Sequence, residues 1–73
     1  MRVSNYSAVD AKRELVESYE ANAKMHQRGA DYYLTFSNPD TKTVEKFQAL
    51  AHSYLEMARI AREEIKKMEA ADV

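Results

Sequence analysis

The stretch Ser37-Asn38-Pro39-Asp40 decides how this chain folds, because it is the only cluster of turn-forming residues in the sequence. Proline disfavours helical geometry at Asn38 and suits the first turn of a following helix. On both sides of this stretch, apolar residues recur with the spacing of an amphipathic helix. We therefore predict helices at about residues 8–36 and 40–70, joined by a turn at about 37–39.

The predicted helix starts carry capping signals. Ser7 followed by Asp10 resembles a capping box with Asp in place of Glu. For the second helix, either Ser37 or Asn38 could supply the capping side chain. Both helices should therefore begin at defined positions.

Each predicted helix carries one stripe of residues, here called its seam, with the 3-4 spacing of a heptad repeat. The seam of the second helix is apolar or Tyr throughout: Val44, Phe47, Ala51, Tyr54, Ala58, Ala61, Ile65 and Met68. The seam of the first helix includes the polar Lys12 and His26: Val9, Lys12, Val16, Tyr19, Ala23, His26, Ala30 and Tyr33.

Folding the two seams together about the turn sets large side chains against small ones. Val16 then faces Ala61, and Tyr19 faces Ala58, as close-packed interiors require. This complementarity favours a hairpin over one continuous rod. We predict an all-α, coiled-coil-like, antiparallel two-helix hairpin that forms a single domain over residues 1–73.

One flank of the predicted hairpin remains apolar, whereas the opposite flank is mostly polar. Two helices cannot bury two apolar stripes, so we expect this flank to pair with a second copy in a four-helix bundle. The alternative is that these side chains widen the core of the hairpin itself. The predicted self-association residues are Leu15, Phe36, Leu50 and Met57.

Three further apolar residues, Met25, Tyr32 and Ile60, fall on outward positions. They could contact a different protein, although scattered exposed apolar side chains are also ordinary. The turn end is the better candidate for such recognition, because tyrosine is favoured at binding hot spots. The aromatic residues at that end are Tyr32, Tyr33, Phe36 and Phe47.

Composition restricts the possible functions. The 73 residues include no cysteine, and 11 basic against 12 acidic residues leave a net charge of −1. Disulfides and thiolate metal sites are therefore excluded, and no strong field draws nucleic acid or an anionic membrane. The sequence shows neither a signal peptide nor an apolar run long enough to span a bilayer, so we expect a soluble cytoplasmic protein.

Catalytic, metal and nucleic-acid sites are all disfavoured by the residue pattern. His26 lies on the seam, and His52 has only Glu56 as a partner one turn away, so no metal or other cofactor is expected. No glycine loop could hold a phosphate, because Gly29 stands alone inside a helix. The basic residues near the C-terminus alternate with glutamates, which indicates a solvated salt-bridge surface: Arg59, Arg62, Lys66 and Lys67.

We therefore expect a non-catalytic protein–protein interaction module that forms a homodimer. Small reading frames of this kind are typical of phage and mobile elements, whose accessory proteins often inhibit a host protein. A small nucleic-acid-binding regulator and a structural subunit of a larger assembly are the alternatives.

Overall fold

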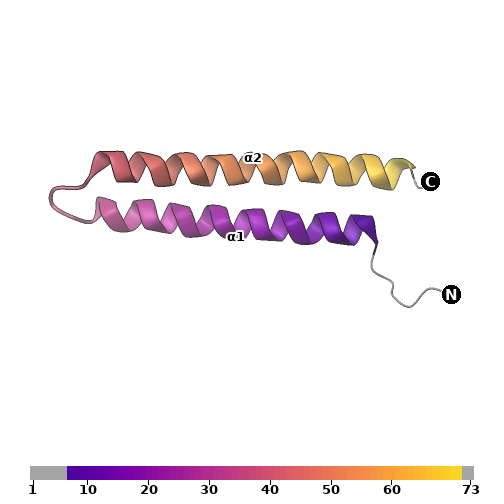
Figure 1. Cartoon of the computed structure of the whole chain (residues 1–73), viewed down its shortest axis with the longest axis horizontal. Helices are drawn as coiled ribbons and strands as arrows, with labels where there is room; N and C mark the ends of the chain where they lie inside the picture. The colour runs from indigo at the N-terminus through magenta and orange to yellow at the C-terminus, as the bar shows by residue number, and fades with distance from the viewer. Residues whose placement is uncertain (1–6, 72–73) are drawn as a thin grey trace.

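The computed structural model describes residues 7–71 and shows an all-α hairpin (Figure 1). Helix α1 spans Ala8–Leu34 and helix α2 spans Thr41–Ala71. The helices lie side by side and antiparallel, so the start of α1 and the end of α2 lie at one end of the molecule. The predicted hairpin is confirmed. Residues 1–6 and 72–73 of the predicted domain lie outside the described part.

The capping box predicted at the start of α1 is confirmed. The Ser7 hydroxyl accepts a hydrogen bond from the Asp10 N–H at 3.1 Å, and the Asp10 carboxylate accepts one from the Ser7 N–H at 3.1 Å. Two N–H groups that would otherwise lack partners are thereby satisfied. This reciprocal bonding fixes the first turn of α1.

The turn is longer than predicted, because α1 ends at Leu34 rather than near residue 36. The Thr35 N–H and hydroxyl both donate to the Tyr32 carbonyl, at 3.1 and 2.6 Å, which tightens the last turn and ends the helix. Phe36 therefore lies in the turn, two residues beyond α1.

Asp40 caps α2, so the prediction of Ser37 or Asn38 as the cap is wrong. The Asp40 carboxylate accepts hydrogen bonds from the Thr43 N–H at 3.3 Å and the Thr43 hydroxyl at 2.8 Å. The Asp40 carbonyl accepts the first helical bond, from the Val44 N–H at 3.1 Å. Pro39 therefore precedes the helix instead of occupying its first turn.

The core runs along the two predicted seams. Every buried side chain among residues 7–71 is a seam residue: Val16, Ala23, Ala30, Val44, Ala51, Ala58, Ala61 and Ile65. Val16 packs with Ala58, Ala61 and Ile65, and Val9 and Tyr19 cover this cluster. The predicted register, with Val16 opposite Ala61, agrees with these contacts.

Aromatic rings of the two helices interlock along the rest of the seam. The His26 ring lies between two rings of α2, 6.0 Å from Phe47 and 5.4 Å from Tyr54 between centroids. The Tyr19 ring contacts Tyr54 at 6.4 Å, and the Tyr33 ring contacts Phe47 at 5.7 Å. Rings alternate with alanines, so each large side chain enters the space beside a small one.

The hairpin is a single layer. Its radius of gyration is 17.1 Å, whereas a compact domain of this length would measure about 11 Å. Each helix therefore has only one neighbour, and most of its circumference faces solvent. This is why apolar side chains outside the seam stay uncovered.

Candidate protein-interaction surface

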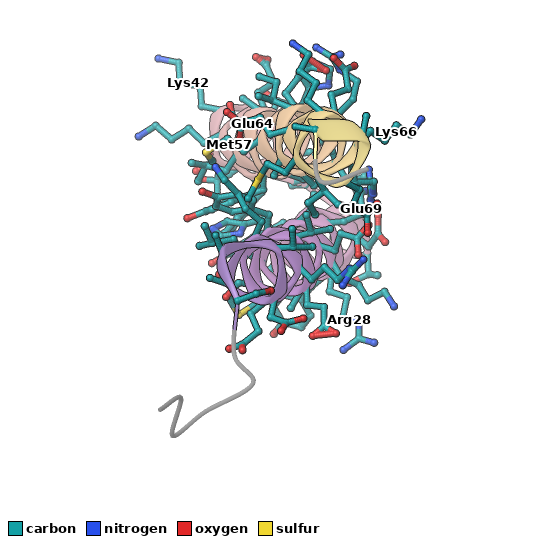
Figure 2. All side chains as sticks on the ribbon, turned by 90° about the vertical axis from the view of Figure 1, so that its right-hand side faces the viewer. Arg28, Lys42, Met57, Glu64, Lys66 and Glu69 are labelled. Carbon is teal, nitrogen blue, oxygen red and sulfur yellow. The ribbon has the colours of Figure 1, made fainter. Side chains whose placement is uncertain are left out.

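The two sides of the hairpin differ in polarity. In a view along the helices, Met57 lies on one side and Glu69 on the other (Figure 2). The side that contains Met57 is here called the apolar face, and its large apolar side chains are between 38% (Met57) and 61% (Tyr32) exposed. Its members are Leu15, Met25, Tyr32, Phe36, Leu50, Met57 and Ile60.

Near the chain ends, the apolar face contains a shallow groove between the helices. Leu15 of α1 and Met57 and Ile60 of α2 line this groove of about 140 Å³, together with Tyr19 and Ala61 of the seam. Lys12 and Glu64 form an ion pair of 2.7 Å beside it. The groove thus has apolar walls and one neutralised charge pair.

At the turn end, the apolar face is aromatic. The Tyr32 ring meets the Phe36 ring edge to face, with centroids 5.1 Å apart. Tyr33 contacts both rings, at 5.6 and 5.7 Å, and also stacks on Phe47. These rings hold one another in place, so the exposed edge of the cluster is preorganised.

The two groups of interface residues predicted from the sequence mix at both ends of the apolar face. Ile60, predicted for a different partner, lines the same groove as Leu15 and Met57. Tyr32, also predicted for a different partner, packs against Phe36. Met25 lies one helical turn from Gly29 and continues the same side of α1. Their roles in binding remain predictions, but the division into two separate surfaces does not follow the geometry.

The opposite side, here called the polar face, is held together by charge. Arg13 pairs with Glu69, and Arg62 pairs with Glu20, so two ion pairs cross between the helices. Exposed ion pairs of this kind contribute little stability each. Their effect is mainly to make this face costly to desolvate, which disfavours it as a self-association surface.

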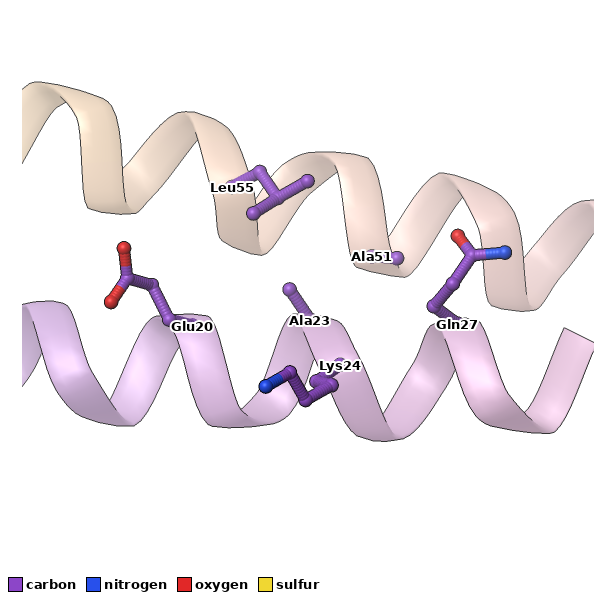
Figure 3. Close-up of a pocket in the computed structure, with 6 residues that line it drawn as sticks. All are labelled: Glu20, Ala23, Lys24, Gln27, Ala51 and Leu55. Carbon is purple, nitrogen blue, oxygen red and sulfur yellow. The ribbon is translucent and has the colours of Figure 1, made fainter.

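The polar face also contains a groove that the sequence reasoning missed (Figure 3). It measures about 430 Å³, and Ala23 and Ala51 form its floor between the helices. The sequence did contain a sign of this groove, because two small seam residues, Ala23 and Ala51, lie near each other across the seam. Its rim is largely polar: Glu20, Lys24, Gln27 and Leu55.

Carboxylates accompany several of the arginines. Arg59 binds Glu56 at 2.8 Å and Glu63 at 2.6 Å on the outer side of α2. The hydrogen bond from Arg59, and then its charge, lowers the pKa of Glu56. The hydrogen bond and charge of Glu56 in turn raise the pKa of Arg59. The guanidinium groups of Arg13, Arg59 and Arg62 therefore meet protein carboxylates.

One histidine packs in the seam and the other lies on the surface. His26 is half-buried, and its Nδ1 lies 2.7 Å from the Asn22 carbonyl oxygen, which can only accept a hydrogen bond. Nδ1 must therefore carry the proton. His52 is exposed. Within residues 7–71, no three histidine or carboxylate side chains converge as a metal site would require.

Neither helix, over its described length, is both long and apolar enough to cross a membrane. No protein-family model, no curated protein and no solved structure matches the chain. The function must therefore be inferred from the surface itself.

Proposed function

We propose that the chain is a non-catalytic protein-interaction module that pairs with a second copy through its apolar face. The observation that carries this proposal is the gathering of exposed Leu, Met, Ile, Tyr and Phe side chains on one side of a single-layer hairpin. Seven of the nine exposed large apolar side chains among residues 7–71 lie on this face, the other two being Leu34 and Leu55; soluble monomers rarely expose large apolar patches. Pairing two such faces would complete a four-helix bundle.

A second copy suits this face better than it suits the polar face. Between its ends, the apolar face carries no ion pair among the described residues, so pairing there desolvates mainly apolar atoms. Docking on the polar face would desolvate the Arg13–Glu69 and Arg62–Glu20 pairs. A chain this short, without disulfides, also gains stability from a partner.

The aromatic turn end supports a second role, which is binding of a different protein. Tyr32 is the most exposed of the large apolar side chains, and its ring is held by Tyr33 and Phe36. A rigid, exposed tyrosine loses little conformational entropy on binding. A modulator of a host protein, as in phage accessory proteins, would use such a surface. Direct nucleic-acid binding is disfavoured, because Arg13, Arg59 and Arg62 already bind carboxylates.

The mass of the protein in solution tests the self-association proposal. Burying a Leu or Met side chain contributes about 1.5–3 kcal/mol, and a micromolar dimer is held by about 8 kcal/mol. Replacing Leu50 and Met57 with Glu in both copies should therefore abolish a dimer that the unmodified chain forms at micromolar concentration. Leu55→Glu, at a somewhat more exposed position on the polar face, is the control and should leave the dimer intact. Light scattering that finds the unmodified chain monomeric would defeat the proposal.

A further inference from the structure

The middle of the apolar face follows a palindromic order along each helix. Along α1 and into the turn, every seventh residue from Leu15 runs large apolar, polar, glycine, large apolar: Leu15, Asn22 and Gly29 of α1, and Phe36 of the turn. In the second helix the equivalent row runs polar, apolar, apolar, polar: Thr43, Leu50, Met57 and Glu64. Each row therefore looks alike when its direction is reversed.

The centres of the two rows lie at nearly the same level of the hairpin. Leu15 lines a groove with both Met57 and Glu64, so it lies level with the part of α2 between them. Met57 is therefore nearer the middle of the hairpin than Leu15. Gly29 lies against the Phe47 ring, one turn before Leu50. The midpoint between Asn22 and Gly29 therefore lies beside the midpoint between Leu50 and Met57. A single two-fold axis can relate both rows to copies of themselves.

We infer that the paired hairpins are antiparallel. The two-fold axis lies in the plane between the two apolar faces, at their centre, and is perpendicular to the helices. The inference rests on the proposed self-association. In this arrangement each helix lies along the same helix of the second copy. Leu15 meets the partner's Phe36, and Leu50 meets the partner's Met57, so large apolar side chains cover one another.

Polar residues are matched by the same operation. Asn22 meets the partner's Gly29 near the axis, and Glu64 meets the partner's Thr43 toward the rim. Lys46 lies one turn from Thr43 on the same side of α2, so its ammonium approaches the partner's Glu64, which already pairs with Lys12 of its own chain. The symmetric arrangement therefore sets apolar side chains against apolar ones and polar side chains against polar ones or glycine.

A parallel pairing of the same faces is poorer. Each helix would then lie along the other helix of the second copy at the same level. Leu50 would meet the partner's Gly29, and Met57 would meet the partner's Asn22. Phe36 would meet the partner's Thr43. Large apolar side chains would then face polar side chains or a glycine, and less apolar surface would be buried.

A distance between spin labels decides between the two arrangements. The chain has no cysteine, so Ser37→Cys places one label in the turn of each copy without further changes. Ser37 is exposed and outside the apolar face. At 1.5 Å per residue, the antiparallel dimer separates the two turns by roughly 35 Å or more, whereas the parallel dimer brings them within roughly 20 Å.

Arg28→Cys, whose side chain points outward (Figure 2) and which lies within three residues of the proposed axis between Asn22 and Gly29, is the matched control. Its two labels are separated by only about 8 Å along the helices in the antiparallel dimer, so its distance should be clearly shorter than that of Ser37. A dimer in which the Ser37 labels lie within roughly 20 Å overturns the inference and leaves self-association standing. A monomeric mass for both labelled chains and the unmodified chain overturns self-association itself, and the inference with it.

Discussion

The Phe47 ring of α2 lies against Gly29 of α1, and a Cβ atom added to Gly29 would stand 3.2 Å from the nearest ring carbon. Such contacts are tighter than ordinary van der Waals packing. The ring has little room to move, because His26 and Tyr33 flank it. The missing side chain at Gly29 therefore lets the helices approach closely at the turn end, and the residue is not simply a weak point in α1.

The first prediction concerns this close approach. Alanine is favoured over glycine in a helix interior by about 1 kcal/mol, so Gly29→Ala would stabilise an unconstrained helix. We expect no gain in the free energy of unfolding, because the added methyl group must displace the Phe47 ring. Gly29→Val should destabilise the protein by about 1–3 kcal/mol through overpacking. Denaturant titrations at a fixed protein concentration provide the measurement.

The control for this prediction is Ala49→Gly at an exposed position of α2, which should cost about 1 kcal/mol. If Gly29→Ala instead stabilised the protein by the amount that this control loses, the contact with Phe47 would impose no constraint.

The second prediction concerns the alanines of the seam. Ala58 is completely buried and packs with Val16 and Ala61. Replacing Ala58 with Leu should overpack the seam and cost about 1–3 kcal/mol. Ala49→Leu adds the same volume at an exposed site and should be nearly neutral. Equal melting temperatures for the two variants would show that Ala58 does not face α1.

Much of this fold could be predicted from the sequence, because one periodic signal governs it. The heptad spacing predicts each buried residue, and the alternation of large and small side chains predicts which residues face each other. Local hydrogen bonding at the turn could not be predicted as well. Ser37, Asn38 and Asp40 are all capable caps, and only the path of the chain decides that Asp40 binds Thr43.

The exposure of the apolar side chains on the candidate surface was predicted from the sequence, whereas their grouping in space was not. Heptad positions separated Ile60 and Tyr32 from the flank of Leu15 and Phe36. Side chains three or four residues apart on a helix touch, so Ile60 joins Met57 in one cluster and Tyr32 joins Phe36 in another. The groove above Ala23 and Ala51 was missed because small seam residues were considered for packing only.

The third prediction concerns pH. Hydrogen bonds from the Thr43 side chain and backbone lower the pKa of Asp40 below the ordinary value of an aspartate. The unfolded chain therefore binds a proton before the folded chain does. The contribution of Asp40 to stability is complete above the unfolded pKa and is lost as the pH falls through the folded pKa.

Asp40→Asn isolates this effect, because Asn is an equally good helix cap that does not titrate. We expect the unmodified protein to lose more of its free energy of unfolding than the variant between neutral pH and about pH 3. The other carboxylates titrate in both proteins and cancel in the difference. An identical loss in both proteins would mean that the Asp40 carboxylate does not act as the charged cap.

The last prediction concerns recognition of a different protein at the aromatic turn end. Loss of Tyr33 or Phe47 should disturb the seam and would reveal little about binding, since both rings pack between the helices. Tyr32 instead projects from the apolar face with most of its surface exposed. Tyr32→Ala should therefore retain the helical content and the dimer, yet lose about 1–2 kcal/mol of affinity for a partner that binds this end.

A pull-down from the native host identifies that partner, and calorimetry with the purified pair then measures the affinity. Leu55→Ala, a comparable truncation on the polar face, is the matched control and should bind as the unmodified chain does. Light scattering on both variants separates a lost contact from a lost dimer. Unchanged affinity for Tyr32→Ala would place heterologous binding elsewhere. If Leu55→Ala alone weakened binding, the groove above Ala23 and Ala51 would be the recognition site, because Leu55 forms part of its wall.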